Sequence, residues 1–90
     1  MRTVAMTIQG HVQGVGFRFF TQTTAVAYDI KGWVRNLNNG DVELEAEGPD
    51  RQMETFIRKI SEGPRFSKVE HVSLADLPEP KGYTEFKITN

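Results

Sequence analysis

Cysteine is absent from the 90-residue sequence, which excludes disulfide bonds, thiolate catalysis and zinc–thiolate sites. Histidine is scarce as well. His11 and His71 lack the clustering expected of a metal site or a catalytic base, so both are interpreted as structural or surface residues. We therefore predict a protein with no bound metal and no cofactor.

The sequence also has neither a basic excess nor a long apolar run. Its formal charge of −1 at pH 7 offers no means to hold a polyanion by counterion release, so a nucleic-acid partner is not expected. No apolar run approaches the roughly 20 residues of a membrane span, and the N-terminus is too polar for a secretory signal. We expect a soluble cytoplasmic protein with no membrane partner.

What is present fits one domain, residues 1–90, since a chain of this length with 38% hydrophobic residues can bury one core but not two. Val4, Met6 and Ile8 alternate with polar residues and predict a first strand. Residues 32–37 and 42–47 predict a hairpin. Residues 66–75 predict a strand of imperfect alternation, for which a bulge is one explanation, and residues 83–88 predict a short last strand.

The register of the hairpin decides which of its side chains face the core, because a slip of one residue reverses every side chain. A two-residue loop would leave Val34 among glutamates. A three-residue loop with Gly40 in the left-handed bulge position instead pairs Val34 with Leu44 and Asn36 with Val42. We favour the second register.

Two helices are predicted from apolar spacing. Over residues 19–30, Phe19, Val26 and Ile30 share one face, and Gly32 is placed to end the helix. The second helix has Asp50 as its expected N-cap and ends at a Gly-Pro pair at residues 63–64. Its core-facing stripe consists of Met53, Phe56, Ile57 and Ile60.

Charged and aromatic residues receive structural interpretations. Alternation places Glu43, Glu45 and Glu47 on a solvated sheet face rather than in a pair of catalytic carboxylates. Trp33 is expected to cover the same open face. The three phenylalanines near the first glycines are expected to be core and loop anchors rather than a base-stacking platform: Phe17, Phe19 and Phe20.

The element order β-α-β-β-α-β with a tail strand predicts an α+β, ferredoxin-like sandwich: an antiparallel sheet, two helices on one face and a short extra C-terminal strand. In this layout the first two strands run parallel with the third between them, so both end at the same edge. We therefore expect Arg18 and Asn36 to share a pocket.

The stretch Gly10-His11-Val12-Gln13-Gly14-Val15-Gly16-Phe17-Arg18 joins the first strand to the first helix. Its glycines let backbone N–H groups converge, and a helix N-terminus and a guanidinium add positive charge, so the composition is typical of an anion cradle. The same residues also fit a plain strand-to-helix turn with a solvated arginine, and Asn36 alone fits a strand-end polar residue. Neither a dinucleotide fingerprint nor a P-loop is present.

This stretch, followed by Gly32-Trp33-Val34-Arg35-Asn36 and Gly40-x-Val42, resembles the acylphosphatase family over nearly the whole chain. The resemblance implies a metal-independent, cofactor-free hydrolase that cleaves the carboxyl–phosphate anhydride of small acyl phosphates to a carboxylate and inorganic phosphate. It implies that Arg18 binds phosphate and that Asn36 positions water. It also implies a cradle of backbone amides from Gln13, Gly14, Val15, Gly16 and Phe17.

The sequence is compatible with two other functions. One is a non-enzymatic ferredoxin-like binding module, although glutamates on the open face and the lack of cysteine disfavour RNA and metals. The other is a relative acting on carbamoyl phosphate within a larger protein, against which the end of the sequence at Asn90 favours a free-standing enzyme. We also expect a monomer. Inorganic phosphate is expected as product and competitive inhibitor, and no second pocket for an acyl group is evident.

Overall fold

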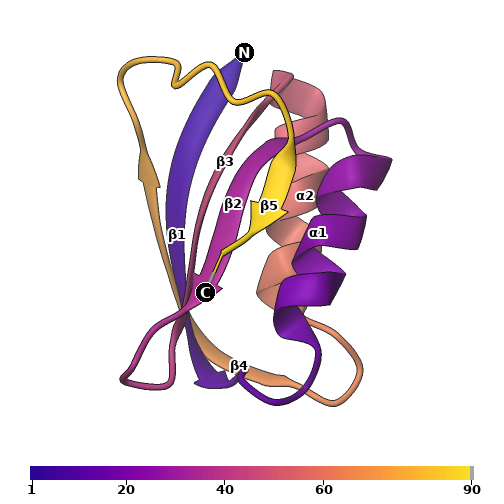
Figure 1. Cartoon of the computed structure of the whole chain (residues 1–90), viewed down its shortest axis with the longest axis vertical. Helices are drawn as coiled ribbons and strands as arrows, with labels where there is room; N and C mark the ends of the chain where they lie inside the picture. Colours follow the sequence, from indigo (N-terminus) through magenta and orange to yellow (C-terminus); the bar gives the residue numbers. More distant parts are fainter. Residues whose placement is uncertain (90) are drawn as a thin grey trace.

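The computed structural model describes residues 1–89, with five strands and two helices (Figure 1). In chain order the elements are β1 (Arg2–His11), α1 (Phe17–Ala27), β2 (Lys31–Asn36), β3 (Val42–Gly48), α2 (Asp50–Glu62), β4 (Lys68–Asp76) and β5 (Phe86–Ile88). The strands form one sheet in the order β4-β1-β3-β2-β5, and both helices cover the same face (Figure 1). The predicted ferredoxin-like α+β layout is confirmed. No helix among residues 1–89 is both long and apolar enough to cross a membrane.

The last strand differs from the prediction in two ways. β5 spans only residues 86–88 instead of 83–88, and it pairs with β2 in parallel, so the sheet is mixed rather than purely antiparallel. The loop after β4 crosses one end of the molecule from one sheet edge to the other (Figure 1), which brings the chain to β5 beside the start of β2. The Gly32 N–H donates to the Glu85 carbonyl over 2.9 Å and fixes this entry point.

The core lies between the sheet and the two helices, as the alternation in the strands requires. Val4, Met6 and Ile8 of β1 are at most 1% exposed. The stripe predicted on α2 is confirmed, because Met53, Phe56 and Ile60 are buried and Ile57 packs against them. Gly63 is the C-cap of α2, as expected.

The hairpin adopts the favoured register. Val34 pairs with Leu44 and Asn36 with Val42. The Leu37 N–H donates to the Asp41 carbonyl over 2.8 Å, so three residues form the loop, and Gly40 has a φ of 98°. On the other face, Arg35 lies opposite Glu43 and pairs with its carboxylate at 2.7 Å. The loop chemistry therefore places Asn36 on the helix-covered side of the sheet.

The predicted limits and buried face of the first helix are wrong. α1 begins at Phe17 and ends at Ala27, and Phe19 and Val26 are 68% and 71% exposed. The buried face includes Thr21 and Thr24, whose hydroxyls donate to the carbonyls four residues earlier. Threonine hydroxyls satisfied in this way can face the core, which an apolar count cannot detect. Phe17 and Phe20 do pack in or against the core, so only Phe19 departs from the expected anchoring role.

Gly32 does not end the first helix. The helix ends at Ala27 with Tyr28 as its C-cap, and Asp29 takes the left-handed conformation that reverses the chain (φ 57°). Gly32 lies inside β2 with a φ of 149°, and a Cβ there would come within 1.9 Å of the Glu45 carbonyl oxygen. Close approach of two strands therefore explains this glycine.

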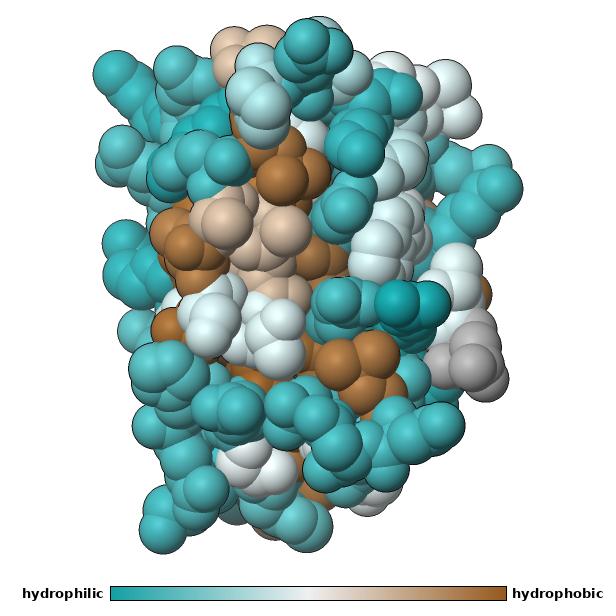
Figure 2. All heavy atoms as spheres, turned by 90° about the vertical axis from the view of Figure 1, so that its left-hand side faces the viewer, coloured by the Kyte–Doolittle hydropathy of each residue, from teal (hydrophilic) through white to brown (hydrophobic). Residues whose placement is uncertain are grey.

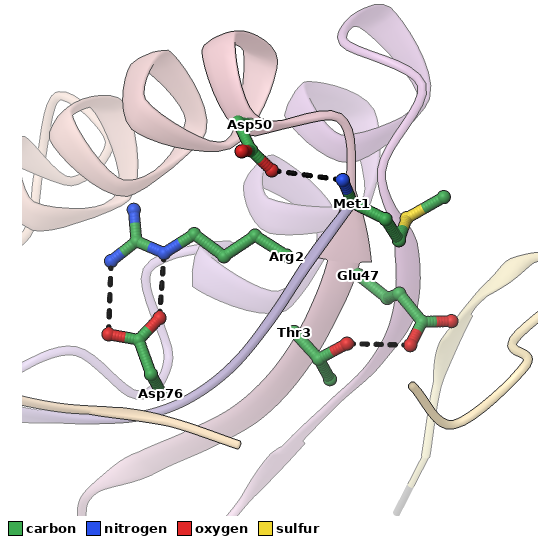
Figure 3. A network of polar contacts seen from close by, with 6 residues as sticks. All are labelled: Met1, Arg2, Thr3, Glu47, Asp50 and Asp76. Carbon is green, nitrogen blue, oxygen red and sulfur yellow. Dashed lines mark hydrogen bonds and ion pairs between the residues drawn. The ribbon is translucent and has the colours of Figure 1, made fainter. Parts of the chain in front are cut away.

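The expected N-cap of the second helix is also displaced by one residue. Pro49 occupies the cap position in an extended conformation, and Asp50 is the first residue of α2. The Asp50 carboxylate lies 3.0 Å from the amino group of Met1 (Figure 3). A carboxylate in the first helical turn also faces the positive end of the helix dipole, so the residue still favours the start of the helix.

β4 contains the bulge that its imperfect alternation suggested. It begins at Lys68 rather than Phe66, and its register with β1 shifts between Gln9 and Gly10, which pair with His71 and Val69. Glu70 is thus the extra residue. A Cβ on Gly10 would lie 2.1 Å from the Lys68 carbonyl oxygen, so the bulge explains the first glycine of the loop stretch.

The open face of the sheet carries small side chains, such as Ala5 and Ala75, beside larger ones. Figure 2 shows a hydrophobic area over this face within hydrophilic surroundings. A shallow hollow there includes Ala5, Ala75 and Trp33 among its lining, together with Glu43 and Glu45. The Trp33 indole donates to the Tyr83 hydroxyl over 3.0 Å, which holds the ring beside the C-terminal segment. Carboxylates on this face disfavour binding of a nucleic-acid backbone.

Glu47 was expected on that solvated face, and this expectation is wrong. Its side chain accepts a hydrogen bond from the Thr3 hydroxyl at 2.6 Å (Figure 3) and is 6% exposed. It also accepts from the backbone N–H groups of Lys81, Gly82 and Tyr83 at 2.6 to 3.2 Å. The Thr3 bond, against the opposing effect of burial and with help from the three amides, holds the pKa of Glu47 below its ordinary value. Glu47 thus fixes the loop that leads to β5.

We expect Glu47→Gln to lower the free energy of unfolding at pH 7 by about 2 kcal/mol, because four donors lose an anionic acceptor. A carboxyl whose pKa is lower in the folded state is protonated first in the unfolded chain. In the native protein this contribution is therefore present above the ordinary pKa and is lost as the pH falls below about 4.5. Urea denaturation at pH 7 and pH 4 measures it, with exposed Glu79→Gln as the control. An equal loss of stability on acidification in all three proteins would contradict this role of Glu47.

Candidate active site

A hollow of about 250 Å³ lies where the β1–α1 loop, the start of α1 and the end of β2 meet. These segments lie at one end of the molecule (Figure 1). Arg18 and Asn36 both line the hollow, so the strand order brings them together as the topology predicted. Its complete lining is Val12, Gly14, Gly16, Phe17, Arg18, Phe19, Asn36 and Ile88. Gln13 and Val15 do not line it.

The loop backbone is shaped by Gly14 and Gly16, which have φ values of 76° and 78°. A Cβ at either position would meet no atom within 4 Å, so conformation rather than crowding requires glycine there. Successive N–H groups in such a loop form a concave surface that suits an anion. The space above the two glycines is open to a ligand.

Gly16 is also the N-cap of α1, and the first helical hydrogen bond runs from the Phe20 N–H to the Gly16 carbonyl at 3.0 Å. The N–H groups of residues 17–19 therefore have no acceptor within the helix. In the described chain, the N–H groups of residues 13–19 make no hydrogen bond to another residue. The first turn has no acidic residue to neutralise the helix dipole. These N–H groups can therefore donate hydrogen bonds to an anionic ligand without losing an existing partner.

Arg18 is the second residue of α1 and is partly buried. Among residues 1–89 its guanidinium forms no ion pair. A guanidinium presents a planar set of N–H donors that matches two oxygens of one phosphate or carboxylate. Placed beside the loop amides, it adds a full positive charge to their partial charges.

Asn36 is the last residue of β2 and lies on the same side of the strand as buried Val34. It is partly exposed, and its carboxamide makes no hydrogen bond to another residue of the described chain. An unused amide oxygen and NH₂ group can therefore hold a small polar molecule in the hollow. The hollow thus combines a cationic fork, free backbone donors and one neutral amide.

Gln13 has a role that sequence analysis missed. Its side-chain Nε2 donates to the Leu37 carbonyl at 2.7 Å and to the Asp41 carbonyl at 2.9 Å. These bonds tie the glycine loop to the base of the hairpin, directly after Asn36. The sequence indicates a contribution of the Gln13 backbone amide only. The side-chain contact cannot be inferred from the sequence, because the two loops are brought together only by the order of the strands in the sheet.

His11 and His71 are both exposed. Across residues 1–89 no three side chains of His, Asp or Glu gather in a group that could hold a metal ion. The polar groups that line the hollow belong to Arg18, Asn36 and the backbone.

The fold and the loop define a class of protein: a small ferredoxin-like α+β domain whose glycine-rich loop precedes a helix carrying an arginine in its first turn. The family model described as Acylphosphatase matches residues 4–88. The chain belongs to the acylphosphatase family.

Individual relatives agree with this membership. The chain is 39% identical to a curated acylphosphatase of Oceanobacillus iheyensis, over 98% of each chain. The crystal structure of acylphosphatase from Bacillus subtilis superposes with a TM-score of 0.97 at 37% identity and full coverage of both chains. A structure of full-length HypF in its phosphate- and nucleotide-bound form is 35% identical with a TM-score of 0.87, but there the chain covers only 12% of the larger protein.

Proposed function

We propose that this chain hydrolyses acyl phosphates in the hollow, with Arg18 and the backbone amides of residues 13–17 binding the phosphoryl group and Asn36 orienting the attacking water. Family membership makes it a hydrolase of acyl phosphates. The observation that carries the assignment of roles is that one hollow contains Arg18, Asn36 and a loop whose N–H groups have no other partner in residues 1–89.

The reaction makes modest demands because an acyl phosphate has a good carboxylate leaving group. Arg18 and the loop amides hold the phosphoryl oxygens and stabilise their charge in the transition state. The Asn36 amide oxygen accepts a hydrogen bond from water and aims a water lone pair at phosphorus. A new P–O bond forms, and the bond to the acyl oxygen breaks with its electron pair leaving on the carboxylate. An amide is too weak a base to take the water proton, so that proton passes to an oxygen of the bound phosphoryl group.

Benzoyl phosphate, with and without a chelator, tests the activity. We expect release of inorganic phosphate at the same rate in both conditions, and competitive inhibition by added phosphate because product and substrate share the cradle. No release by a folded sample would overturn the proposal in favour of a binding module. Circular dichroism on the same sample establishes that it is folded.

The second candidate is a carbamoyl-phosphate enzyme in which the domain is part of a larger protein, and full-length HypF is a larger protein that contains a similar domain. The match to the Oceanobacillus iheyensis relative over 98% of that chain favours the free-standing enzyme. We propose further that residues 1–90 act as one monomeric cytoplasmic domain with no nucleic-acid partner. Comparing kcat/KM for carbamoyl and benzoyl phosphate separates the candidates, because a dedicated carbamoyl-phosphate enzyme would prefer the former.

Gln13 is proposed as a positioning residue. In Gln13→Ala the glycine loop loses both hydrogen bonds to the hairpin, so the phosphoryl group and the water held by Asn36 are no longer fixed relative to each other. We expect kcat to fall about tenfold with a smaller change in phosphate inhibition, since misplacement acts mainly on the transition state. Gln52→Ala, on α2 and outside the hollow, is the control. A wild-type kcat in Gln13→Ala would contradict the role.

A further inference from the structure

Two large apolar side chains stand exposed at the hollow. Phe19 is 68% exposed and Ile88 is 40% exposed, and both line the space that Arg18 and Asn36 line. The other large apolar side chains that are exposed in residues 1–89 line no part of it: Met1, Val26, Phe66 and Leu74. Exposed apolar surface beside a polar site is typical of a ligand contact.

The two side chains reach the hollow from different elements. Phe19 follows Arg18 in the first turn of α1. It lies outside the buried face of the helix and is directed away from the core. Ile88 ends β5 and pairs with Val34, two residues before Asn36. The catalytic groups proposed above are therefore flanked by apolar side chains on both the helix and the strand side.

Ile88 is held in place by the backbone around it. The Thr89 N–H donates to the Val34 carbonyl at 2.8 Å, which extends the pairing of β5 with β2. Earlier in the chain, the hydrogen bonds that the backbone N–H groups of Lys81, Gly82 and Tyr83 donate to Glu47 fix the loop that leads into β5. The position of Ile88 beside the hollow is thus built into the fold.

The lining gives the acyl group a chemical preference. Apart from Arg18 and Asn36, every residue that lines the hollow is apolar or glycine. Because Arg18 binds the phosphoryl group in the proposed mechanism, a charged acyl group would lose hydration there without gaining a charged partner, whereas an apolar group would remove surface of Phe19 and Ile88 from water.

We propose that Phe19 and Ile88 form the contact for the acyl group, so that the substrates are acyl phosphates with a bulky apolar acyl group, preferred over small ones. The proposal rests on the proposed function, since the phosphoryl group must lie against Arg18 for the acyl group to reach these side chains. It also identifies an acyl contact that the sequence did not make evident.

The test compares kcat/KM for benzoyl phosphate and acetyl phosphate. We expect the wild type to prefer benzoyl phosphate. In Phe19→Ala the ratio of the two values should fall about tenfold, the scale of a lost apolar contact in a binding pocket. Ile88→Thr keeps a β-branched residue in β5 and should lower the ratio in the same direction. Phe19→Leu, which retains apolar surface, should restore part of it.

Phe66→Ala is the matched control, because Phe66 is 75% exposed and lies outside the hollow. It should leave the ratio at the wild-type value. Inhibition by inorganic phosphate, which has no acyl group, gives the second readout and should change far less than the ratio in Phe19→Ala.

The outcomes separate this inference from the proposed function. An unchanged ratio in both Phe19→Ala and Ile88→Thr, with both substrates still hydrolysed, would overturn the acyl contact and leave the proposed function intact. Hydrolysis of neither substrate by the wild type would overturn the proposed function itself. Thermal melting of each variant shows whether it is folded at the temperature at which the ratio is measured.

Discussion

Asn36→Ala is expected to lower kcat for benzoyl phosphate by at least about a hundredfold, the scale on which a mispositioned reactant slows catalysis. KM and the inhibition constant of phosphate should change little, because in the proposed mechanism Asn36 holds the water while Arg18 and the loop hold the phosphoryl group. The reason is geometric: Asn36 supplies the only side-chain amide on the hollow among the described residues. Steady-state kinetics with benzoyl phosphate measure the separation of kcat from KM.

Asn38→Ala is the control for this variant, since Asn38 is exposed in the adjoining hairpin loop and does not line the hollow. It should behave as the wild type. If Asn36→Ala kept a wild-type kcat, or lost phosphate binding in proportion to kcat, the water-positioning role would be wrong.

Arg18→Ala is expected to weaken substrate binding and turnover together. The guanidinium is the one charged group on the lining of the hollow. In the proposed mechanism it contacts oxygens that gain charge in the transition state. We expect kcat/KM to fall by about a thousandfold and the inhibition constant of phosphate to rise. Arg18→Lys should recover part of the binding, because a point charge replaces a planar fork.

Exposed Arg58 on α2 provides the control, and Arg58→Ala should retain wild-type kinetics. Hydrolysis of benzoyl phosphate at a near-wild-type rate by folded Arg18→Ala would remove Arg18 from the site. It would also leave the loop without its cation, and the anion-binding interpretation would then rest on backbone donors alone.

The elements with simple periodicity could be predicted from the sequence. The α2 stripe and the hairpin register follow from residue spacing and from the turn chemistry of Asn38-Asn39-Gly40, which tolerates the positive φ that its three-residue loop requires. Once these elements and their order are known, the topology places Arg18 near Asn36. The shared hollow is therefore a consequence of fold-level rules.

Features that depend on side chains satisfying one another could not be predicted. The face of α1 was misassigned because Thr21 and Thr24 bury their hydroxyls on carbonyls of the same helix. Glu47 lies on the same sheet face as Glu43 and Glu45 but is buried there, because a distant loop covers it and supplies three N–H donors. Gln13 joins two loops that only the tertiary structure brings together. Each of these side chains makes a hydrogen bond either to a residue distant in the sequence or within its own helix, and neither kind of bond can be inferred from hydropathy.

The misassigned face of α1 affects function as well as fold. With the predicted phase, Phe19 would lie in the core and the acyl group would have no apolar contact on the helix side. With the observed phase, Phe19 is exposed beside Arg18. The proposed acyl contact on the helix side therefore depends on the observed buried face of α1, which leaves Phe19 exposed.

In the proposed mechanism the hollow directs water at phosphorus rather than at the carbonyl carbon. Hydrolysis of benzoyl phosphate in water enriched in ¹⁸O, followed by mass spectrometry of both products, distinguishes the two sites of attack. We expect the label in inorganic phosphate and an unlabelled benzoate. Label in the benzoate would show attack at the acyl carbon and would contradict the roles given to Arg18 and Asn36.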